Sequence, residues 1–224
     1  MGTVQFNEKE SAYIIHSVLI FYGGSASDEL AKKAASDVAD YWNGPNAGIT
    51  IHNQLIYVRF VIEGYNLPEL TQEDVIHNID PANNFFRVEE QTNMDVSFVD
   101  GIGSNTGYFK LANLLQTGTT AAHEYGHTIG LDHPENMDIR GLGIPGIMFP
   151  RGTITDPEFQ YNPLGDAGDS SNGGTMNPMH RQVTINDIES LQLHRLAFDN
   201  NYMAVLGAFS SVWHNKFASG GWWV

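Results

Sequence analysis

The sequence predicts an α/β fold of the α+β kind, in which a helix packs against a mixed sheet. Two observations support this fold class. Runs of β-branched and aromatic residues alternate with an amphipathic helical pattern, and a second helical pattern follows the last of these runs. The chain has 224 residues and no internal repeat, so we expect one domain that covers residues 1–224.

Four runs have the composition of β-strands. The first is YIIHSVLIFY at residues 13–22, which ends at a pair of glycines. The second is LIYVRFVIE at 55–63, and the third is the shorter DVSFVD at 95–100, which leads into a glycine-rich turn. The last is TGYFKLA at 106–112, which we interpret as an edge strand of the sheet.

Three helices are predicted around one irregular stretch. Apolar residues recur at helical intervals from 30 to 42, and a second helix is expected over residues 119–130. The third helix follows Thr184 and Asp187, which have the spacing of a capping box. Between the last two helices, residues 134–180 are rich in Gly, Pro, Asn and Asp, so we expect irregular structure there.

The charge of the chain limits its partners. There are 26 acidic and 11 basic residues, a formal net charge of −15, whereas nucleic-acid binding needs clustered Lys and Arg. No apolar run approaches the roughly 20 residues that cross a bilayer. We expect no nucleic-acid partner and no membrane span, and we take the chain to be a monomer. Residues 1–10 lack the features of a signal peptide, and this absence does not fix the compartment. We expect a secreted or cell-envelope protein, with any signal peptide absent from this chain.

One motif carries the chemistry of the sequence. Residues 123–133 read HEYGHTIGLDH, the pattern H-E-x-x-H-x-x-G-x-x-H. Residues four apart lie on one face of a helix, so His123 and His127 can direct their imidazoles at one metal ion. Gly130 readily adopts positive φ, so the chain can turn back and bring His133 to the same ion. Because the chain contains no cysteine, a zinc site must be built from histidines and carboxylates.

Glu124 completes the motif. It follows His123 directly, so its carboxylate can lie beside the metal and accept a proton from a bound water without coordinating. Three protein ligands leave a fourth position for water and substrate. We therefore predict one catalytic Zn²⁺ held by His123, His127 and His133, with Glu124 as the general base. The alternative is that the three histidines only make ordinary hydrogen bonds at a helix end, which would leave this spacing to chance.

The motif resembles the signature of the metzincins, a clan of zinc metallopeptidases with a methionine turn beneath the metal. Within this clan, TTAAHEYGHTIGLDHP is most similar to the matrixin branch, and the resemblance covers about residues 13–198. It implies an upper subdomain (residues 1–133) with a twisted mixed sheet and two long helices above the cleft. It also implies a small irregular lower subdomain (residues 134–224) with a C-terminal helix.

Two methionines are candidates for the methionine turn. Met148 lies in GIMFP, which resembles the matrixin turn in its Met-aromatic-Pro ending, whereas Met176 in GTMNP lies closer to the last helix. We favour Met148 and keep Met176 as the alternative. With Met148 in the turn, the resemblance makes Phe149, Pro150 and Arg151 candidates to line the pocket for the residue that follows the cleaved bond.

The sequence also departs from the matrixins. No histidine lies between residues 95 and 120, and only two residues there are acidic, Asp95 and Asp100. We therefore expect neither the structural zinc nor the calcium that the resemblance would otherwise imply.

The function implied is that of a zinc-dependent endopeptidase, which hydrolyses peptide bonds of a peptide or protein substrate with a metal-activated water. Residues 106–112 could pair with the substrate main chain by β-augmentation. The alternative from another class is a catalytically silent zinc-binding interaction domain of the same fold, and a third is a zinc hydrolase acting on another bond. Glu124 argues against the silent domain, because a structural zinc has a closed fourth position and needs no base.

Overall fold

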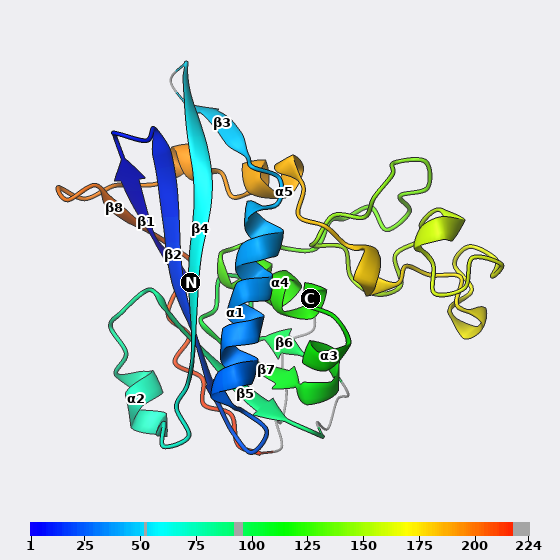
Figure 1. The fold of residues 1–224 in the computed structure, drawn as a ribbon, viewed down its shortest axis with the longest axis horizontal. Helices are drawn as coiled ribbons and strands as arrows, with labels where there is room; N and C mark the ends of the chain where they lie inside the picture. The colour runs from blue at the N-terminus through cyan, green and yellow to red at the C-terminus, as the bar shows by residue number, and fades with distance from the viewer. Residues whose placement is uncertain (52, 92–95, 217–224) are drawn as a thin grey trace.

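The computed structural model describes residues 1–51, 53–91 and 96–216 (Figure 1). The protein has a mixed α/β fold built on an eight-stranded sheet. The strands are β1 (Gly2–Asn7), β2 (Ala12–Tyr22), β3 (Gly48–Ile51), β4 (Gln54–Asn66), β5 (Asn83–Glu89), β6 (Phe98–Val99), β7 (Thr106–Lys110) and β8 (Met203–Leu206). The α-helices are α1 (Asp28–Asn43), α2 (Gln72–Ile76), α3 (Leu111–Gln116), α4 (Thr119–Thr128) and α5 (Ile185–Ser190).

The sheet is parallel at its centre and antiparallel at its edges. Along its main path the strand order is β3-β4-β2-β5-β7-β6, in which β4, β2, β5 and β7 are parallel and β3 and β6 are antiparallel to their neighbours. β1 pairs with the first half of β2, and β8 pairs with β1. The two longest predicted strands, at 13–22 and 55–63, are confirmed as β2 and β4.

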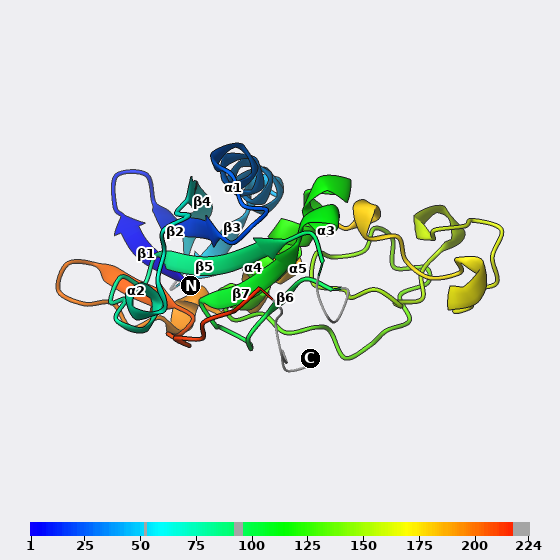
Figure 2. The ribbon, with the colours of Figure 1, turned by 90° about the horizontal axis from the view of Figure 1, so that it is seen from below.

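The alternation of side chains along β2 divides the interior into two cores. Ile15, Leu19 and Phe21 point into the main core, which α1 and α4 cover. Ile20 and Tyr22 point to the opposite face and pack in a smaller cluster with residues of α2 and β5. Figure 2 shows α1 on one side of the sheet and α2 on the other. The helix α4, which carries two of the candidate metal ligands, therefore packs against the main core.

Trp42 fixes α4 against α1. Its side chain is 1% exposed and its Nε1 donates to the carbonyl of Ala122 at 3.0 Å. Its ring packs edge-on against Tyr125 of α4, with the ring centroids 5.7 Å apart. Because an indole N–H is costly to bury without a partner, this contact orients α4 as well as packing it.

The structure corrects the prediction of an edge strand at residues 106–112. β7 ends at Lys110, and the next two residues begin α3. β5 lies on one side of β7 and β6 on the other, so β7 has no free edge where Gly107 and Tyr108 face β6. The predicted strand at 95–100 is confirmed only at Phe98–Val99, and Asp95 lies outside the described residues.

The end of the chain differs from the predicted C-terminal helix. Thr184 and Asp187 form the expected capping box, which confirms the start of α5, but this helix has only six residues. Gln192 then adopts a left-handed conformation (φ +50°), and Phe198 lies beyond the helix, stacked on Tyr13 at 5.3 Å between ring centroids. The chain continues into β8. The prediction of irregular structure before α5 holds, since residues 134–180 contain only short 3₁₀ turns and isolated bridges (Figure 1).

A buried carboxylate holds the segment after β8 to the sheet. Oδ2 of Asp100 accepts hydrogen bonds from Nε2 of His214 at 2.9 Å and from Oγ1 of Thr106 at 2.5 Å. The side chains of Asp100 and His214 are each 6% exposed. Nearby, Trp213 stacks on Tyr22 with the ring centroids 4.6 Å apart. The last described residues are therefore fixed by polar and aromatic contacts, which include a hydrogen bond from the N–H of His214 to the hydroxyl of Tyr22 at 3.2 Å.

We expect Asp100→Ala to lower the free energy of unfolding by about 1–3 kcal/mol, because it leaves Nε2 of the buried His214 without its acceptor, whereas Oγ1 of Thr106 keeps its contact with Oγ of Ser210. Urea unfolding followed by tryptophan fluorescence measures the change. Asp40→Ala is the matched control, since Asp40 is exposed on α1. A loss for Asp100→Ala no larger than that for Asp40→Ala would contradict this role of Asp100.

Candidate metal centre

α4 places the first two candidate ligands inside the protein. All ten of its residues are buried, including His123, Glu124 and His127. A helix that is buried on every side needs partners for its polar side chains. The imidazoles of His123 and His127 and the carboxylate of Glu124 therefore need partners inside the protein.

The turn that ends α4 brings back the third histidine and orients the second. Gly130 has φ +101°, a conformation that favours glycine. The N–H of Gly130 donates to the carbonyl of His127 at 3.1 Å, and the N–H of Leu131 donates to that of Gly126 at 3.0 Å. These two bonds form a Schellman motif. In the same turn the Leu131 carbonyl accepts from Nδ1 of His127 at 2.8 Å.

A second carbonyl orients His123. The carbonyl of Ile147, in the irregular segment, lies 2.7 Å from Nδ1 of His123. A carbonyl only accepts hydrogen bonds, so Nδ1 of both His123 and His127 carries the proton and Nε2 carries the lone pair. Backbone carbonyls that fix the tautomer in this way are the usual outer partners of metal-bound histidines.

The three Nε2 atoms converge on one point. Nε2 of His133 lies 3.1 Å from Nε2 of His123 and 3.2 Å from Nε2 of His127. Nitrogen ligands of a tetrahedral zinc, each about 2.0–2.1 Å from the ion, are about 3.3 Å apart. Lone pairs that face one another without a shared proton or cation repel. The donor set and its spacing therefore fit a metal ion such as Zn²⁺, and His123, His127 and His133 form a possible metal site.

Burial keeps the ligands in the form that binds metal. It lowers the pKa of His123 well below its usual value, and the positive charge of Arg181 acts in the same direction. Burial also lowers the pKa of His127 to about 4, against the opposite effect of its hydrogen bond to Leu131. Both imidazoles are therefore neutral near pH 7, as a metal ligand must be.

Met148 and Met176 are both buried but lie in different surroundings. A Cβ atom placed on Gly126, in the middle of α4, would overlap Sδ of Met148 and lie 3.1 Å from its Cε. Met148 therefore packs directly under the helix that carries His123 and His127. Met176 lies within the irregular segment, where its N–H donates to the carbonyl of Thr153 at 2.9 Å. These contacts favour Met148 for the methionine turn, and its role there stays a prediction.

Glu124 shares its surroundings with two arginines. Burial raises the pKa of Glu124 to about 8, and the positive charges of Arg181 and Arg151 act in the opposite direction. The motif located Glu124, but the sequence analysis did not identify Arg181. Arg181 precedes α5 in a region without periodicity, so no local pattern marks it. His180, beside it, is half-buried and packs edge-on against Phe159.

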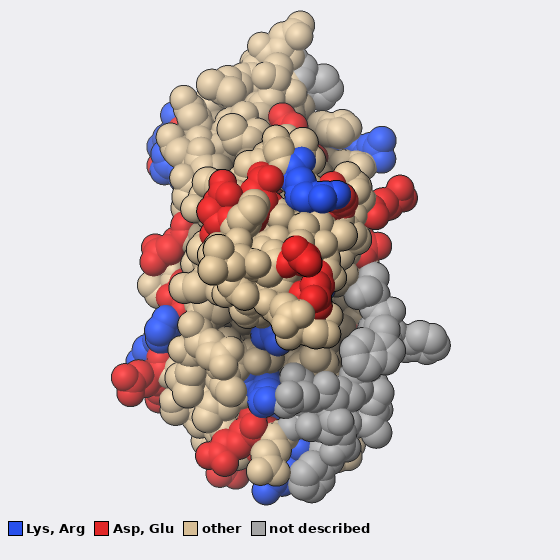
Figure 3. All heavy atoms as spheres, turned by 90° about the vertical axis from the view of Figure 1, so that its right-hand side faces the viewer, with Lys and Arg blue, Asp and Glu red and all other residues tan. Residues whose placement is uncertain are grey.

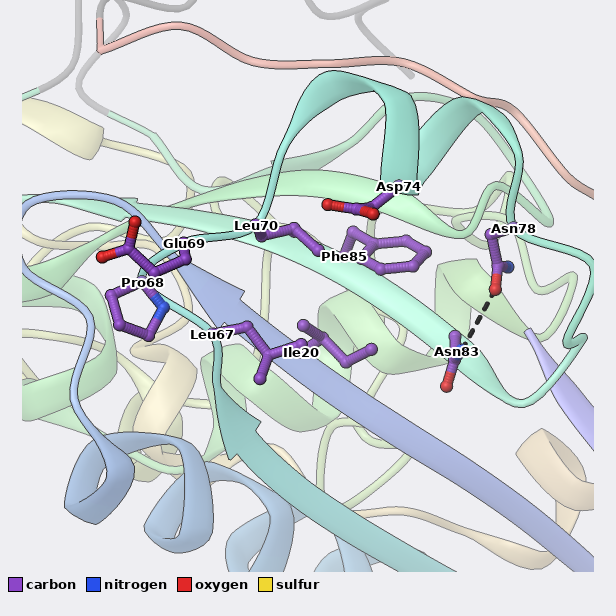
Figure 4. A pocket seen from close by; sticks show the side chains of 9 residues that line it. All are labelled: Ile20, Leu67, Pro68, Glu69, Leu70, Asp74, Asn78, Asn83 and Phe85. Atoms are coloured by element: carbon purple, nitrogen blue, oxygen red, sulfur yellow. Dashed lines mark hydrogen bonds between the residues drawn. The ribbon is translucent and has the colours of Figure 1, made fainter.

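A separate hollow lies on the opposite face of the sheet, under α2 (Figure 4). Its volume is about 510 Å³, and apolar side chains such as Ile20 and Phe85 form its floor. Asp74 at its rim already accepts from the N–H and hydroxyl of Thr71. The hollow shares no residue with the histidine cluster. Within the described ranges, His123, His127 and His133 are the only group of three or more His, Cys, Asp or Glu residues that could hold a metal.

The surface beside the irregular segment carries charges of both signs. Figure 3 shows acidic and basic side chains interspersed on this face, and the basic ones do not gather into one patch. In the part of the chain that the structure covers, no helix is long and apolar enough to span a bilayer.

No protein-family description matches this chain, and no curated protein sequence is similar to it. The function of this chain is therefore inferred from the motif and from the geometry of the site.

We expect purified protein to bind one zinc ion per chain, because the Nε2 atoms of three imidazoles face one point. His127→Ala should lose the ion, as measured by metal analysis after dialysis against zinc-buffered solution. His180→Ala is the matched control because His180 lies outside the cluster, and it should keep the ion. Full zinc content in His127→Ala would remove His127 from the ligand set.

We expect Gly126→Ala to destabilise the protein by about 1–3 kcal/mol, although alanine normally favours helices, because the new methyl group overlaps Met148. Combining it with Met148→Ala should cost less than the sum of the two single changes, since the smaller side chain makes room. The same cycle with Met176→Ala is the control and should be additive. Coupling to Met176 and additivity with Met148 would reverse the assignment of the turn.

Proposed function

We propose that this protein is a zinc-dependent endopeptidase of the metzincin kind, similar to the matrixin branch. One observation carries the proposal: the Nε2 atoms of three histidines, two of them buried, converge on one point, and the residue next to the first ligand is a buried glutamate. A structural zinc site has no use for that carboxylate. The H-E-x-x-H-x-x-G-x-x-H motif supports the same conclusion, because it places these groups at the spacing of that clan.

Each residue of the site then has a defined task. His123, His127 and His133 would hold the ion, and zinc, when bound, supplies Lewis acidity that makes a water more acidic and polarises a carbonyl. The carboxylate of Glu124 would accept a proton from the attacking water. It would then deliver this proton to the amine nitrogen of the departing product. The buried setting excludes bulk water, which strengthens each of these charge interactions.

The segment after Met148 is proposed to contact the substrate. Met148 would form the floor beneath the ligands, and Phe149, Pro150 and Arg151 would line the pocket for the residue after the cleaved bond. Phe149 and Pro150 are half-buried and Arg151 is exposed, as lining residues need to be. We further propose that residues 1–133 and 134–224 form the two walls of one catalytic domain in a secreted or cell-envelope protein.

We expect Glu124→Gln to keep zinc and to lose peptidase activity by roughly a hundred- to ten-thousandfold, because proton transfer is lost and coordination is not. Casein digestion with and without a chelator, beside metal analysis, measures both properties. Glu135→Gln is the matched control, since Glu135 is exposed two residues after the last ligand.

Three results distinguish the alternatives. A zinc-loaded Glu124→Gln protein with near-wild-type kcat would exclude Glu124 as the base. Zinc binding without chelator-sensitive digestion of any protein or peptide would favour the silent interaction domain. Turnover of a non-peptide ester or amide alone would favour a zinc hydrolase of another class.

A further inference from the structure

Arg181 is a buried cation whose hydrogen bonds are incomplete. Arg181 is only 5% exposed to solvent. Nη1 donates to the carbonyl of Phe149 at 3.2 Å, and Nη2 lies 3.5 Å from Oγ1 of Thr119. Nε is buried and has no partner. No ion pair joins Arg181 to a carboxylate of residues 1–51, 53–91 or 96–216.

This arrangement is unfavourable unless a further group completes it. Burial of a guanidinium that forms no ion pair costs several kcal/mol, although the charge of ionised Glu124 offsets part of that cost for Arg181. A buried donor without a partner adds to the cost. Nε and Nη2 form one edge of the guanidinium, the fork that binds a carboxylate through two parallel hydrogen bonds. In Arg181 this edge carries the unpartnered Nε and only one long contact.

The charge of Arg181 interacts with ionised Glu124, but no residue that the structure describes accepts a hydrogen bond from its Nε. Arg181 joins two segments of the site, because Thr119 begins α4 and Phe149 follows Met148. The N–H of Gln182, next along the chain, also donates to the carbonyl of Pro145 at 3.0 Å, so the two irregular segments are already tied by their backbones. A neutral donor could make the bond to the Phe149 carbonyl without the cost of a buried cation.

A second cation lies near the first. Arg151 is exposed, and no ion pair connects it to any carboxylate in the described part of the chain. Burial lowers the pKa of Arg181, and the nearby charge of Arg151 acts in the same direction. Both arginines also act on Glu124. Two unpaired arginines beside the proposed base stand out in a chain with 11 basic and 26 acidic residues.

We propose that Arg181, with Arg151 nearer the surface, binds a carboxylate of the substrate, so that the preferred substrates are peptides with Asp or Glu beside the cleaved bond. This inference rests on the proposed peptidase function. The unfilled edge of Arg181 supplies the bidentate contact, and the charge of Arg151 attracts the acidic side chain from solvent.

Matched peptide substrates test the proposal without changing the protein. A library that places Glu or the isosteric Gln at each position flanking the cleaved bond is digested by the zinc-loaded wild type, and the products are identified by mass spectrometry. We expect Glu to exceed Gln in kcat/KM by about 30-fold or more at one position, as for other buried charge pairs. Equal rates for Glu and Gln at every position would overturn the proposal.

Three variants assign the preference to its residues. Arg181→Gln should abolish the preference for Glu over Gln at that position, and Arg151→Gln should reduce it. Arg59→Gln is the matched control, because Arg59 lies on β4, pairs with Glu10, and changes the net charge equally when it is replaced. It should leave the preference unchanged. If Arg181→Gln does not fold, the soluble Arg151→Gln variant and the Glu/Gln substrate pairs still decide the outcome.

A binding measurement separates this inference from the proposed reaction. Glu124→Ala protein loaded with zinc is titrated with the preferred Glu peptide and its Gln counterpart, each carrying a fluorescent label, and anisotropy gives the two dissociation constants. Tighter binding of the Glu peptide that disappears with Arg181→Gln supports the carboxylate site even if turnover is absent. Cleavage of peptides with no acidic preference would leave the peptidase function intact and exclude this role of Arg181.

Discussion

The close approach of residues 146–149 to α4 is the constraint on which the candidate site depends. Gly126 has no side chain, so Met148 occupies the space beside it, while Trp42 lies 3.2 Å from the position of the missing Cβ. The same approach brings the carbonyl of Ile147 within 2.7 Å of Nδ1 of His123. A larger residue at position 126 would move this segment outward and remove the carbonyl that fixes the tautomer of His123. The packing of residues 146–149 on α4 and the orientation of His123 therefore both depend on the small residue at position 126.

Burial of α4 has opposite effects on the groups of the site. It removes the charge from the imidazoles of His123 and His127, which suits coordination of a dication. It also disfavours the anionic form of Glu124, which the proposed chemistry needs. The positive charges of Arg181 and Arg151 favour that anion, and the charge of Arg181 also disfavours protonation of His123. Arg181 therefore supports both the neutral ligands and the charged base, and Arg151 supports the base.

Local patterns in the sequence predicted the parts of the fold that local interactions determine. The long apolar runs became β2 and β4, and the capping box at Thr184 marked the start of α5. The three histidines are brought together by one helix and one glycine turn, so their grouping could also be predicted from the sequence. The pairing of β7 with β5 and β6 could not be predicted, because no pattern in the sequence indicates which strands lie next to each other. The short strands β1 and β8 pair across almost the whole chain and carry no strong alternation.

The choice between Met148 and Met176 shows where the sequence became insufficient. Both follow a glycine and a β-branched residue and precede a proline, and only contacts across the fold distinguish them. Met148 packs on α4, whereas the backbone of Met176 pairs with Thr153. Oγ1 of Thr153 in turn donates to the carbonyl of Pro150 at 2.8 Å. Residues 149–152 are thus held at both ends, at Met148 by α4 and at Thr153 by Met176. A short segment fixed in this way can present Arg151 to a substrate at a constant position without belonging to a helix or a strand.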